Sequence, residues 1–138
     1  ETLRAAKIEQ AEVLVLALED MDRSIRTARV AKKLNPTLKI IARARNRRHA
    51  HKLMDLGIDD AVRETLHSAL LITHKVLEGL GFSDAAAADR VARFRTLDEA
   101  SLKEQFLFHD DEQALIQSVA QSRTELAALF EADAKMVP

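Results

Sequence analysis

The 138-residue sequence contains no cysteine, no tryptophan and no tyrosine. Without cysteine, the chain forms no disulfide, no zinc–thiolate site and no thiol nucleophile. Without tryptophan and tyrosine, it has few rings on which nucleic-acid bases stack. Its isoelectric point of about 6.6 also lacks the basic excess of most nucleic-acid-binding domains. We therefore predict that nucleic acid is not a partner.

Long hydrophobic runs are absent as well. The longest strongly apolar runs are VLVLAL (13–18) and ALLI (69–72), far short of the roughly 20 residues of a membrane-spanning helix. No signal peptide is visible. The first residues, ETLRAAKIEQ, resemble the last turns of a helix, and no start methionine precedes them. We therefore expect the chain to be a piece of a longer polypeptide.

The residues that are present suit a folded domain. Hydrophobic residues make up 47% of the chain and charged residues 31%, enough for both a core and a charged surface. The charge is unevenly distributed: residues 1–82 carry 15 Lys and Arg against 11 Asp and Glu, whereas 83–138 carry 6 against 11. The basic front and the acidic back are expected to face different partners.

Apolar runs of strand length alternate with helical patterns through the first 82 residues. A continuous run such as EVLVLAL (12–18) is typical of a strand buried on both faces of a parallel sheet. Alternation of this kind predicts right-handed crossovers and a Rossmann-like α/β sheet. Only about three strands are present, roughly half of such a sheet. The expected strands are 12–18, 38–44 and 60–63, and the expected helices are about 21–34, 47–56 and 65–80. We predict that the runs 13–18 and 38–44 form adjacent parallel strands. The last helix is expected to bury a stripe made of Leu66, Ala69, Leu70, Thr73, Val76, Leu77 and Leu80.

The pattern changes after Phe82. Residues 84–108 and 111–133 have helical patterns, and no strand signal remains. We therefore predict two regions: 1–82 as the C-terminal half of a Rossmann-like domain, and 83–138 as a helical extension. The extension carries more apolar residues than a half-sheet covers, so we predict that it is a dimerisation element.

The sharpest local feature is KIIARARNRRHAHK (39–52), with five positive side chains in residues 43–52. Arg43 and Arg45 fall at the carboxyl end of an expected strand and point the same way. Ligands of open α/β sheets bind at that end, and the helix beginning after Asn46 adds free amides and a positive dipole. This predicts an anion site. The alternative is a solvated helix face, which is also the interpretation of Arg47 and Arg48.

Glu19 and Asp20 directly follow the first strand. An acid there can accept hydrogen bonds from ribose hydroxyls, or it can simply cap the next helix; the sequence leaves both open. The five histidines have no defensible metal-ligand spacing: His49 and His51 are two apart and diverge on a helix, and His67 and His74, seven apart on one face, have no third ligand nearby. No nucleophile elbow, catalytic triad, Walker loop or GxGxxG motif occurs. We therefore predict no metal, no catalytic residues and no enzyme activity.

The order of these motifs resembles a known family. Residues 11–81, AEVLVLALED through HKVLEGLG, resemble the second half of the regulatory nucleotide-binding domain of bacterial potassium transporters, called RCK or KTN. Within them, IIARARNRRHAHKLMDLGIDDAVRET (40–65) is most similar to the glutathione-gated potassium efflux antiporters of the Kef type. The helical remainder resembles the family only in character.

The resemblance implies a ligand-sensing domain that gates potassium efflux, with potassium leaving as protons enter. It implies AMP or NAD(H) at the strand end carrying Ala17, Glu19 and Asp20. It also implies glutathione, or a glutathione adduct, on Arg45, the second arginine of ARAR, with Arg43 beside it. Glutathione has two carboxylates, which suit one or two guanidinium groups.

The resemblance further implies a homodimer on the cytoplasmic face of the inner membrane. A membrane antiporter domain is expected in the same polypeptide, and a flavin-containing quinone reductase-like protein as ancillary subunit. Two alternatives remain open. One is a nucleotide-binding gating domain of another potassium channel or uptake system, without glutathione; the other is a fragment of an NAD-dependent oxidoreductase.

Overall fold

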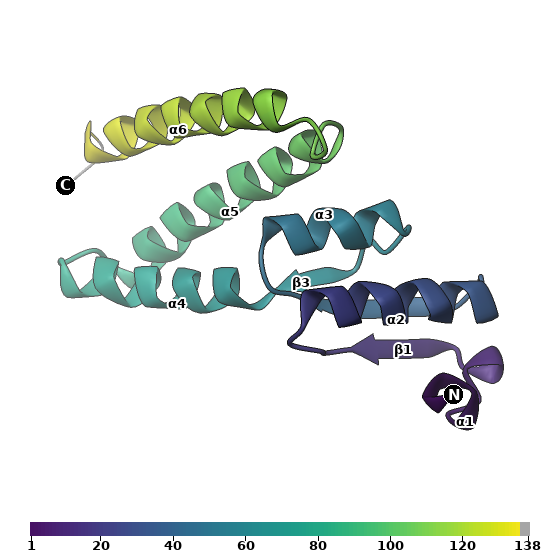
Figure 1. Ribbon diagram of the computed structural model, residues 1–138. Coiled ribbons are helices and arrows are strands. Elements are labelled where there is room, and N and C mark those ends of the chain that lie inside the picture. Colours follow the sequence, from purple (N-terminus) through teal and green to yellow (C-terminus); the bar gives the residue numbers. More distant parts are fainter. Residues whose placement is uncertain (136–138) are drawn as a thin grey trace. The chain divides into compact units, whose positions relative to one another are not determined.

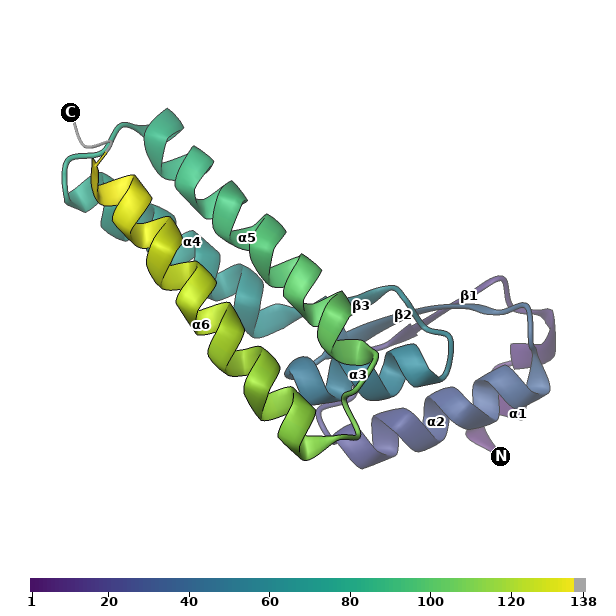
Figure 2. The same cartoon turned by 90° about the horizontal axis from the view of Figure 1, so that it is seen from above.

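The computed structural model describes residues 1–135, which form two compact units, Glu1–His67 and the part from Ser68 onward. Figures 1 and 2 label the elements of both units. The first contains a short helix, a 3-10 turn, and three strands that alternate with helices. Their bounds are α1 Thr2–Ala5, η1 Ile8–Gln10, β1 Val13–Leu16, α2 Met21–Leu34, β2 Lys39–Ala44, α3 Arg47–Asp55, β3 Ala61–Arg63 and the start of α4 Glu64–Gly79.

The three strands form one parallel sheet in the order β1-β2-β3. Leu14 is in register with Ile40, and Ala42 is in register with Ala61. The expected α/β fold with a partial, three-stranded Rossmann-like sheet is confirmed, as is the prediction that the runs 13–18 and 38–44 contain adjacent parallel strands.

The core of this unit lies on one face of the sheet. Figure 2 shows α2 and α3 on the same side of the strands, and they bury alternate residues such as Leu16, Ile40 and Ala42. On the opposite face Val15 is 70% exposed, and Val13 and Val62 are also exposed. The prediction that the strand at 12–18 is buried on both faces is therefore wrong. A strand covered on one face alternates in burial because its side chains alternate in direction.

Local signals fix the ends of the helices. The Asp20 carboxylate accepts a hydrogen bond from the Arg23 amide at 2.7 Å and caps α2, and Asn46 accepts one from the His49 amide at 2.9 Å and caps α3. Gly57 adopts the left-handed conformation expected just beyond α3, with φ of 74°. These caps hold the loops that follow β1 and β2.

The second unit is entirely helical within the residues described. Beyond the rest of α4 it contains α5 Asp84–Phe106 and α6 Glu112–Lys135 (Figure 1). The predicted core stripe of α4 is wrong in most positions: Leu70 is buried, whereas Val76 and Leu80 are exposed. The stripe has the helical period of a packed face but finds too few apolar neighbours within its own unit.

Polar contacts join α5 to α6. Arg93 Nη2 lies 2.6 Å from Asp133 Oδ1, and Ser101 Oγ lies 2.9 Å from Ser122 Oγ. The units divide between His67 and Ser68, inside α4, whereas the predicted domain boundary lies after Phe82. No helix among residues 1–135 has the length and apolar content to span a membrane.

Candidate functional site

The candidate site lies at the carboxyl edge of the sheet, where all three strands pass into helices. Because the strands are parallel, the loop after β1, the Arg45–Asn46 corner after β2 and the start of α4 after β3 meet at one edge. The amino ends of α2, α3 and α4 all lie there. Free amides and helix dipoles give such an edge a positive potential.

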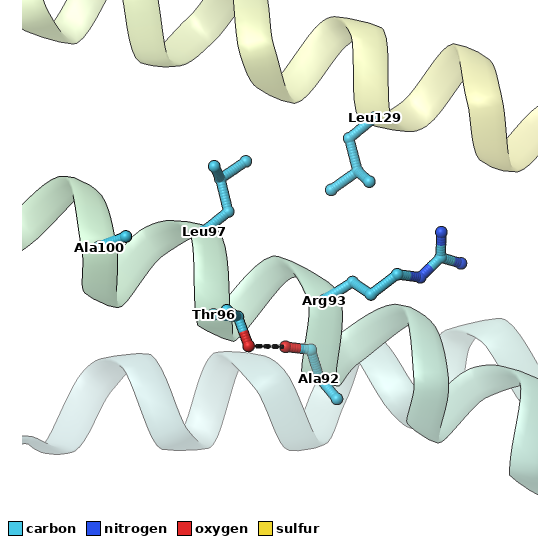
Figure 3. A pocket seen from close by; sticks show the side chains of 6 residues that line it. All are labelled: Ala92, Arg93, Thr96, Leu97, Ala100 and Leu129. Carbon is cyan, nitrogen blue, oxygen red and sulfur yellow. Dashed lines mark hydrogen bonds between the residues drawn. The ribbon is translucent and has the colours of Figure 1, made fainter.

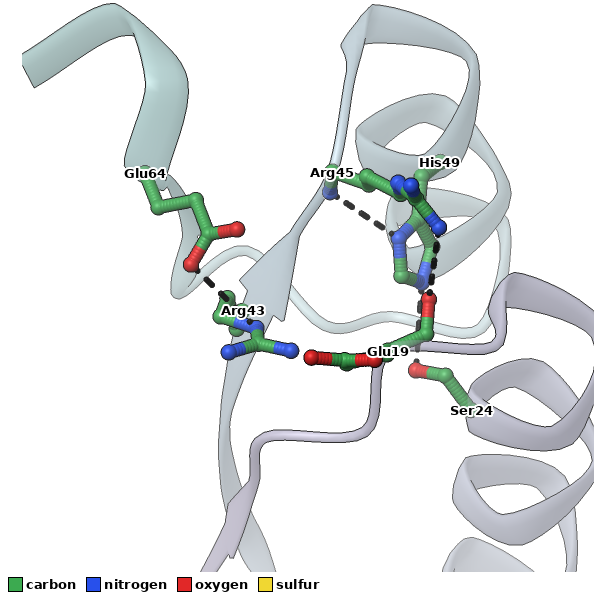
Figure 4. A network of polar contacts seen from close by, with 6 residues as sticks. All are labelled: Glu19, Ser24, Arg43, Arg45, His49 and Glu64. Carbon is green, nitrogen blue, oxygen red and sulfur yellow. Dashed lines mark hydrogen bonds and ion pairs between the residues drawn. The ribbon is translucent and has the colours of Figure 1, made fainter.

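Arg43 is already paired within the chain. Its Nε lies 3.4 Å from Oε2 of Glu64, the first residue of α4, and the arginine side chain is half-buried (Figure 4). The sequence did not predict this partner, because the two residues come from different strands' ends. An acid directly after the third strand was the available signal. Part of the charge in the basic cluster is therefore balanced internally.

Arg45 has a different environment. It directly follows β2 and is exposed, and its Nη1 is 3.5 Å from the carbonyl oxygen of Glu19. Among residues 1–135, its guanidinium forms no ion pair. This matches the expectation that the side chain points to the crevice rather than the core. A charged group with one long hydrogen bond keeps most of its donors available to an external anion.

The three residues expected to contact a nucleotide lie in the loop after β1. Ala17 and Glu19 are exposed, and Figure 4 shows Glu19 in the same region as Arg43 and Arg45. Asp20 caps α2 through one carboxylate oxygen, so the capping alternative holds for this residue. The structure brings all five predicted ligand residues to one edge; their ligand roles stay predictions.

His49 is the residue that sequence reasoning missed. Its spacing from His51 predicts only that the two side chains diverge, yet His49 is only 1% exposed. Its Nδ1 lies 3.1 Å from the backbone nitrogen of Arg45, and its Nε2 lies 3.1 Å from Ser24 Oγ in α2. Burial, with Lys52 nearby, lowers the pKa of His49. The missed signal was a histidine three residues after a capping asparagine, on the sheet side of the helix.

A groove lies in the second unit, between α5 and α6 (Figure 3). Its volume is about 470 Å³ and its walls are mostly apolar. The charge of Arg93 is met by Asp133 and by Asp89 at 3.2 Å. The groove therefore offers no unbalanced charge to a ligand. The lining residues are Ala92, Arg93, Thr96, Leu97, Ala100 and Leu129.

Another polar cluster joins α4 to α5. His74 Nε2 lies 2.8 Å from Asp84 Oδ1 and 3.7 Å from Glu78 Oε2. The sequence did not predict this pairing of His74 with two acids. Contacts between an imidazole and two carboxylates account for this cluster without an ion.

The parallel α/β sheet and the cationic site at its carboxyl edge are typical of a ligand-binding Rossmann-like domain, and comparison with known families agrees with this class of protein. Residues 1–64 match the TrkA-N domain, and residues 68–137 match the domain described as "Potassium efflux system KefB C-terminal domain". The two matches meet where the compact units divide. The chain is thus an RCK/KTN-type domain, and it belongs to the KefB C-terminal domain family of potassium efflux systems.

A solved structure supports the same placement. The C-terminal domain of a Kef protein from Shewanella denitrificans, in an AMP-bound form, is 37% identical to this chain. The alignment covers 77% of this chain and 67% of that one, with a TM-score of 0.74. The predicted membership of the Kef-type family is confirmed, and the chain is a regulatory domain of a potassium efflux system.

Proposed function

We propose that this chain is the ligand-sensing domain of a glutathione-gated K⁺/H⁺ efflux antiporter. In this proposal it binds a nucleotide and glutathione, or a glutathione adduct, and gates potassium efflux without catalysing a reaction. A membrane antiporter domain in the same polypeptide holds it at the cytoplasmic face of the inner membrane. The proposal joins the family membership to the chemistry of the carboxyl edge.

The nucleotide, AMP or NAD(H), is proposed to bind the loop after β1. Glu19 is exposed there, and the Shewanella relative was solved with AMP. A carboxylate at this position accepts hydrogen bonds from ribose hydroxyls. In the full natural protein, Glu19→Gln is expected to weaken AMP binding about 10- to 150-fold, the range for a lost charge-assisted hydrogen bond.

Calorimetry with AMP measures this change. Glu12→Gln is the matched control, because it removes the same exposed charge just before β1, at the opposite end of the strand. An equal loss of affinity in both variants would contradict a local role for Glu19.

Glutathione is proposed to bind Arg45. The observation that carries this proposal is that its guanidinium, beside the amino end of α3, forms no ion pair with any of the described residues. A peptide carboxylate there meets both a full cation and a helix dipole. Arg43 is proposed as the second cation. Its pairing with Glu64 makes its contribution smaller, because the ligand must compete with an internal carboxylate.

The test compares two arginines with the same charge. Arg45→Gln in the full natural protein is expected to raise the glutathione dissociation constant about 10- to 150-fold. Arg48→Gln, which removes an exposed charge in the first turn of α3, is expected to cost at most about 1 kcal/mol. Calorimetry and melting temperatures measure both. Equal losses of glutathione affinity in both variants would mean that the basic cluster acts only as a diffuse positive field. Unchanged glutathione binding in Arg45→Gln overturns the proposed site.

The runner-up is a gating domain of another potassium channel or uptake system that binds nucleotide without glutathione. Its support is the match of residues 1–64 to the TrkA-N domain. Heat of binding with AMP, and none with glutathione or its adducts, would favour it.

The third candidate is a fragment of an NAD-dependent oxidoreductase. Measurable oxidation of NADH by a quinone would favour this candidate.

A homodimer is proposed from exposed apolar side chains on α4 and α6, including Ile72, Val76 and Phe130. Ile72 and Val76 are four residues apart and share one face of α4. Light scattering of the full protein at tens of micromolar is expected to give a dimer, and Val76→Lys to shift it towards monomer. Lys75→Glu, an exposed neighbour, is the control. A monomeric parent protein contradicts the proposal.

The ancillary partner in this proposal is a flavin-containing quinone reductase-like subunit, which the resemblance alone suggests. Co-purification of a flavin protein with the natural complex tests it. A complex that carries no flavin under mild extraction would count against this partner and leaves the ligand proposals standing.

A further inference from the structure

His49 occupies the corner between β2 and α3, and both of its ring nitrogens are engaged. The imidazole is almost completely buried, and so is its partner Ser24. On one side Nδ1 lies 3.1 Å from the backbone nitrogen of Arg45, and on the other Nε2 lies 3.1 Å from Ser24 Oγ (Figure 4). The ring therefore bridges the end of β2 and the first turns of α2.

The contacts fix the protonation of the ring. A backbone N–H only donates, so Nδ1 must accept the hydrogen bond from Arg45 with an unprotonated lone pair. The neutral ring then carries its proton on Nε2, which donates to Ser24 Oγ. The amide of His49 also donates to Asn46 Oδ1 at 2.9 Å. The Arg45–Asn46 corner is thus held by His49 from two directions.

We propose that His49 is a positioning residue for anion binding by Arg45. By holding the Arg45 peptide, the ring sets the point from which the flexible arginine side chain leaves the strand. A ligand-binding group is effective when its support is itself fixed by hydrogen bonds and packing. The inference rests on the function proposed for Arg45, and it adds a buried residue that no ligand touches.

The ring holds Arg45 only while it is neutral. Protonation would place an N–H on Nδ1, facing the Arg45 N–H, so two donors would meet. The ring contacts the Arg45 backbone at the end of β2 and the uncharged Ser24 hydroxyl of α2, and Lys52 in its own helix acts on its charge. None is an acid that would stabilise an imidazolium, and burial lowers the pKa of His49 below its usual value. The hold is therefore intact at neutral pH and lost under acidic conditions.

Two substitutions separate the two contacts of the ring. His49→Asn places an amide oxygen near the position of Nδ1, so the acceptor for Arg45 is kept and the contact to Ser24 is lost. His49→Gln reaches the position of Nε2, so the donor to Ser24 is kept and the acceptor for Arg45 is lost. Glutathione affinity at pH 7.5 is expected to fall about 3- to 10-fold in His49→Gln, the effect of one lost hydrogen bond, and to change less than about 3-fold in His49→Asn.

The pH profile supplies a readout that a purely structural role would not move. Glutathione carboxylates remain ionised well below pH 5. Affinity of the parent protein is therefore expected to fall as the pH drops through the lowered pKa of His49, on the acid side of the usual histidine pKa of about 6.5, whereas His49→Asn is expected to show a flatter profile. Identical profiles, or equal losses of affinity in the Asn and Gln variants at equal melting temperature, overturn the inference.

A ligand-independent measurement keeps the inference separate from the function on which it rests. Hydrogen exchange of the Arg45 amide in the full protein is expected to be slow in the parent and in His49→Asn, and at least about 3-fold faster in His49→Gln. If these exchange rates are observed but Arg45→Gln binds glutathione normally, the proposed function fails, whereas the hydrogen bond from Arg45 to His49 remains supported. Unchanged exchange in His49→Gln overturns the positioning role by itself.

Discussion

The two compact units bury different kinds of side chain. The first, residues 1–67, contains all but two of the buried hydrophobic residues among those described; the exceptions are Leu70 and Ala87. The second buries polar groups such as Gln105 and Asp133 and leaves large apolar residues on α4 and α6 exposed. The first unit is therefore held by burial of its own apolar surface, whereas the second relies more on directional polar contacts.

Removing a core side chain from the first unit is expected to have the largest effect. Leu53 in α3 is fully buried, so Leu53→Ala should lower the free energy of unfolding by about 2–5 kcal/mol through lost burial and a residual cavity. Urea titration measures this change. Leu107→Ala in the second unit, at 81% exposed, should change it by less than about 0.5 kcal/mol. Similar losses of unfolding free energy in both variants would contradict the difference between the two units.

Breaking the pair between α5 and α6 is expected to have an intermediate effect confined to the second unit. Arg93→Met leaves the largely buried Asp133 carboxylate without its cation. Breaking fully buried pairs costs about 3–5 kcal/mol; Arg93 is one-third exposed, so about 1–3 kcal/mol is expected. Hydrogen exchange measures this effect: the amides of α6 should exchange faster, and the exchange rates of β2 should stay unchanged. Arg95→Met, which breaks an exposed pair with Glu99, should have little effect.

The contact between α4 and α5 is expected to contribute least. Asp84→Asn removes the charge 2.8 Å from His74, but the carboxylate is mostly exposed. Exposed pairs contribute about 0–1 kcal/mol, so the melting temperature should fall by a few degrees at most. Asp59→Asn, which changes an exposed acid in the first unit, is the control. The difference in melting temperature between the two variants should vanish in 1 M salt. A large loss that persists in salt would show that the second unit depends on this contact more than exposure suggests.

Much of the first unit follows from short-range signals. The apolar runs at 13–18 and 38–44 predicted parallel neighbours, and the caps Asp20 and Asn46 marked two helix starts. The position of Arg45 at the carboxyl end of a strand was also predictable. These features depend on residues within a few positions of one another, so the sequence encodes them directly. The family resemblance rests on the same segment.

Three features were not predictable from the sequence. Arg43 is neutralised by Glu64, the ring of His49 bridges Ser24 and Arg45, and one face of β1 is exposed. The stripe on α4 gave the period of a buried helix, yet most of it lies at the surface. Periodicity reports that a face is apolar, and it does not report whether a neighbour is present to cover it.

The sequence by itself thus determined the order of strands and helices, their caps and the edge at which the arginines gather. Only the tertiary structure decided which of these cations is balanced internally and which stays available, and that a buried histidine holds the second. The physical reason is distance along the chain: Ser24 and His49 are 25 residues apart, and they meet only because parallel crossovers return both helices to the same face of the sheet.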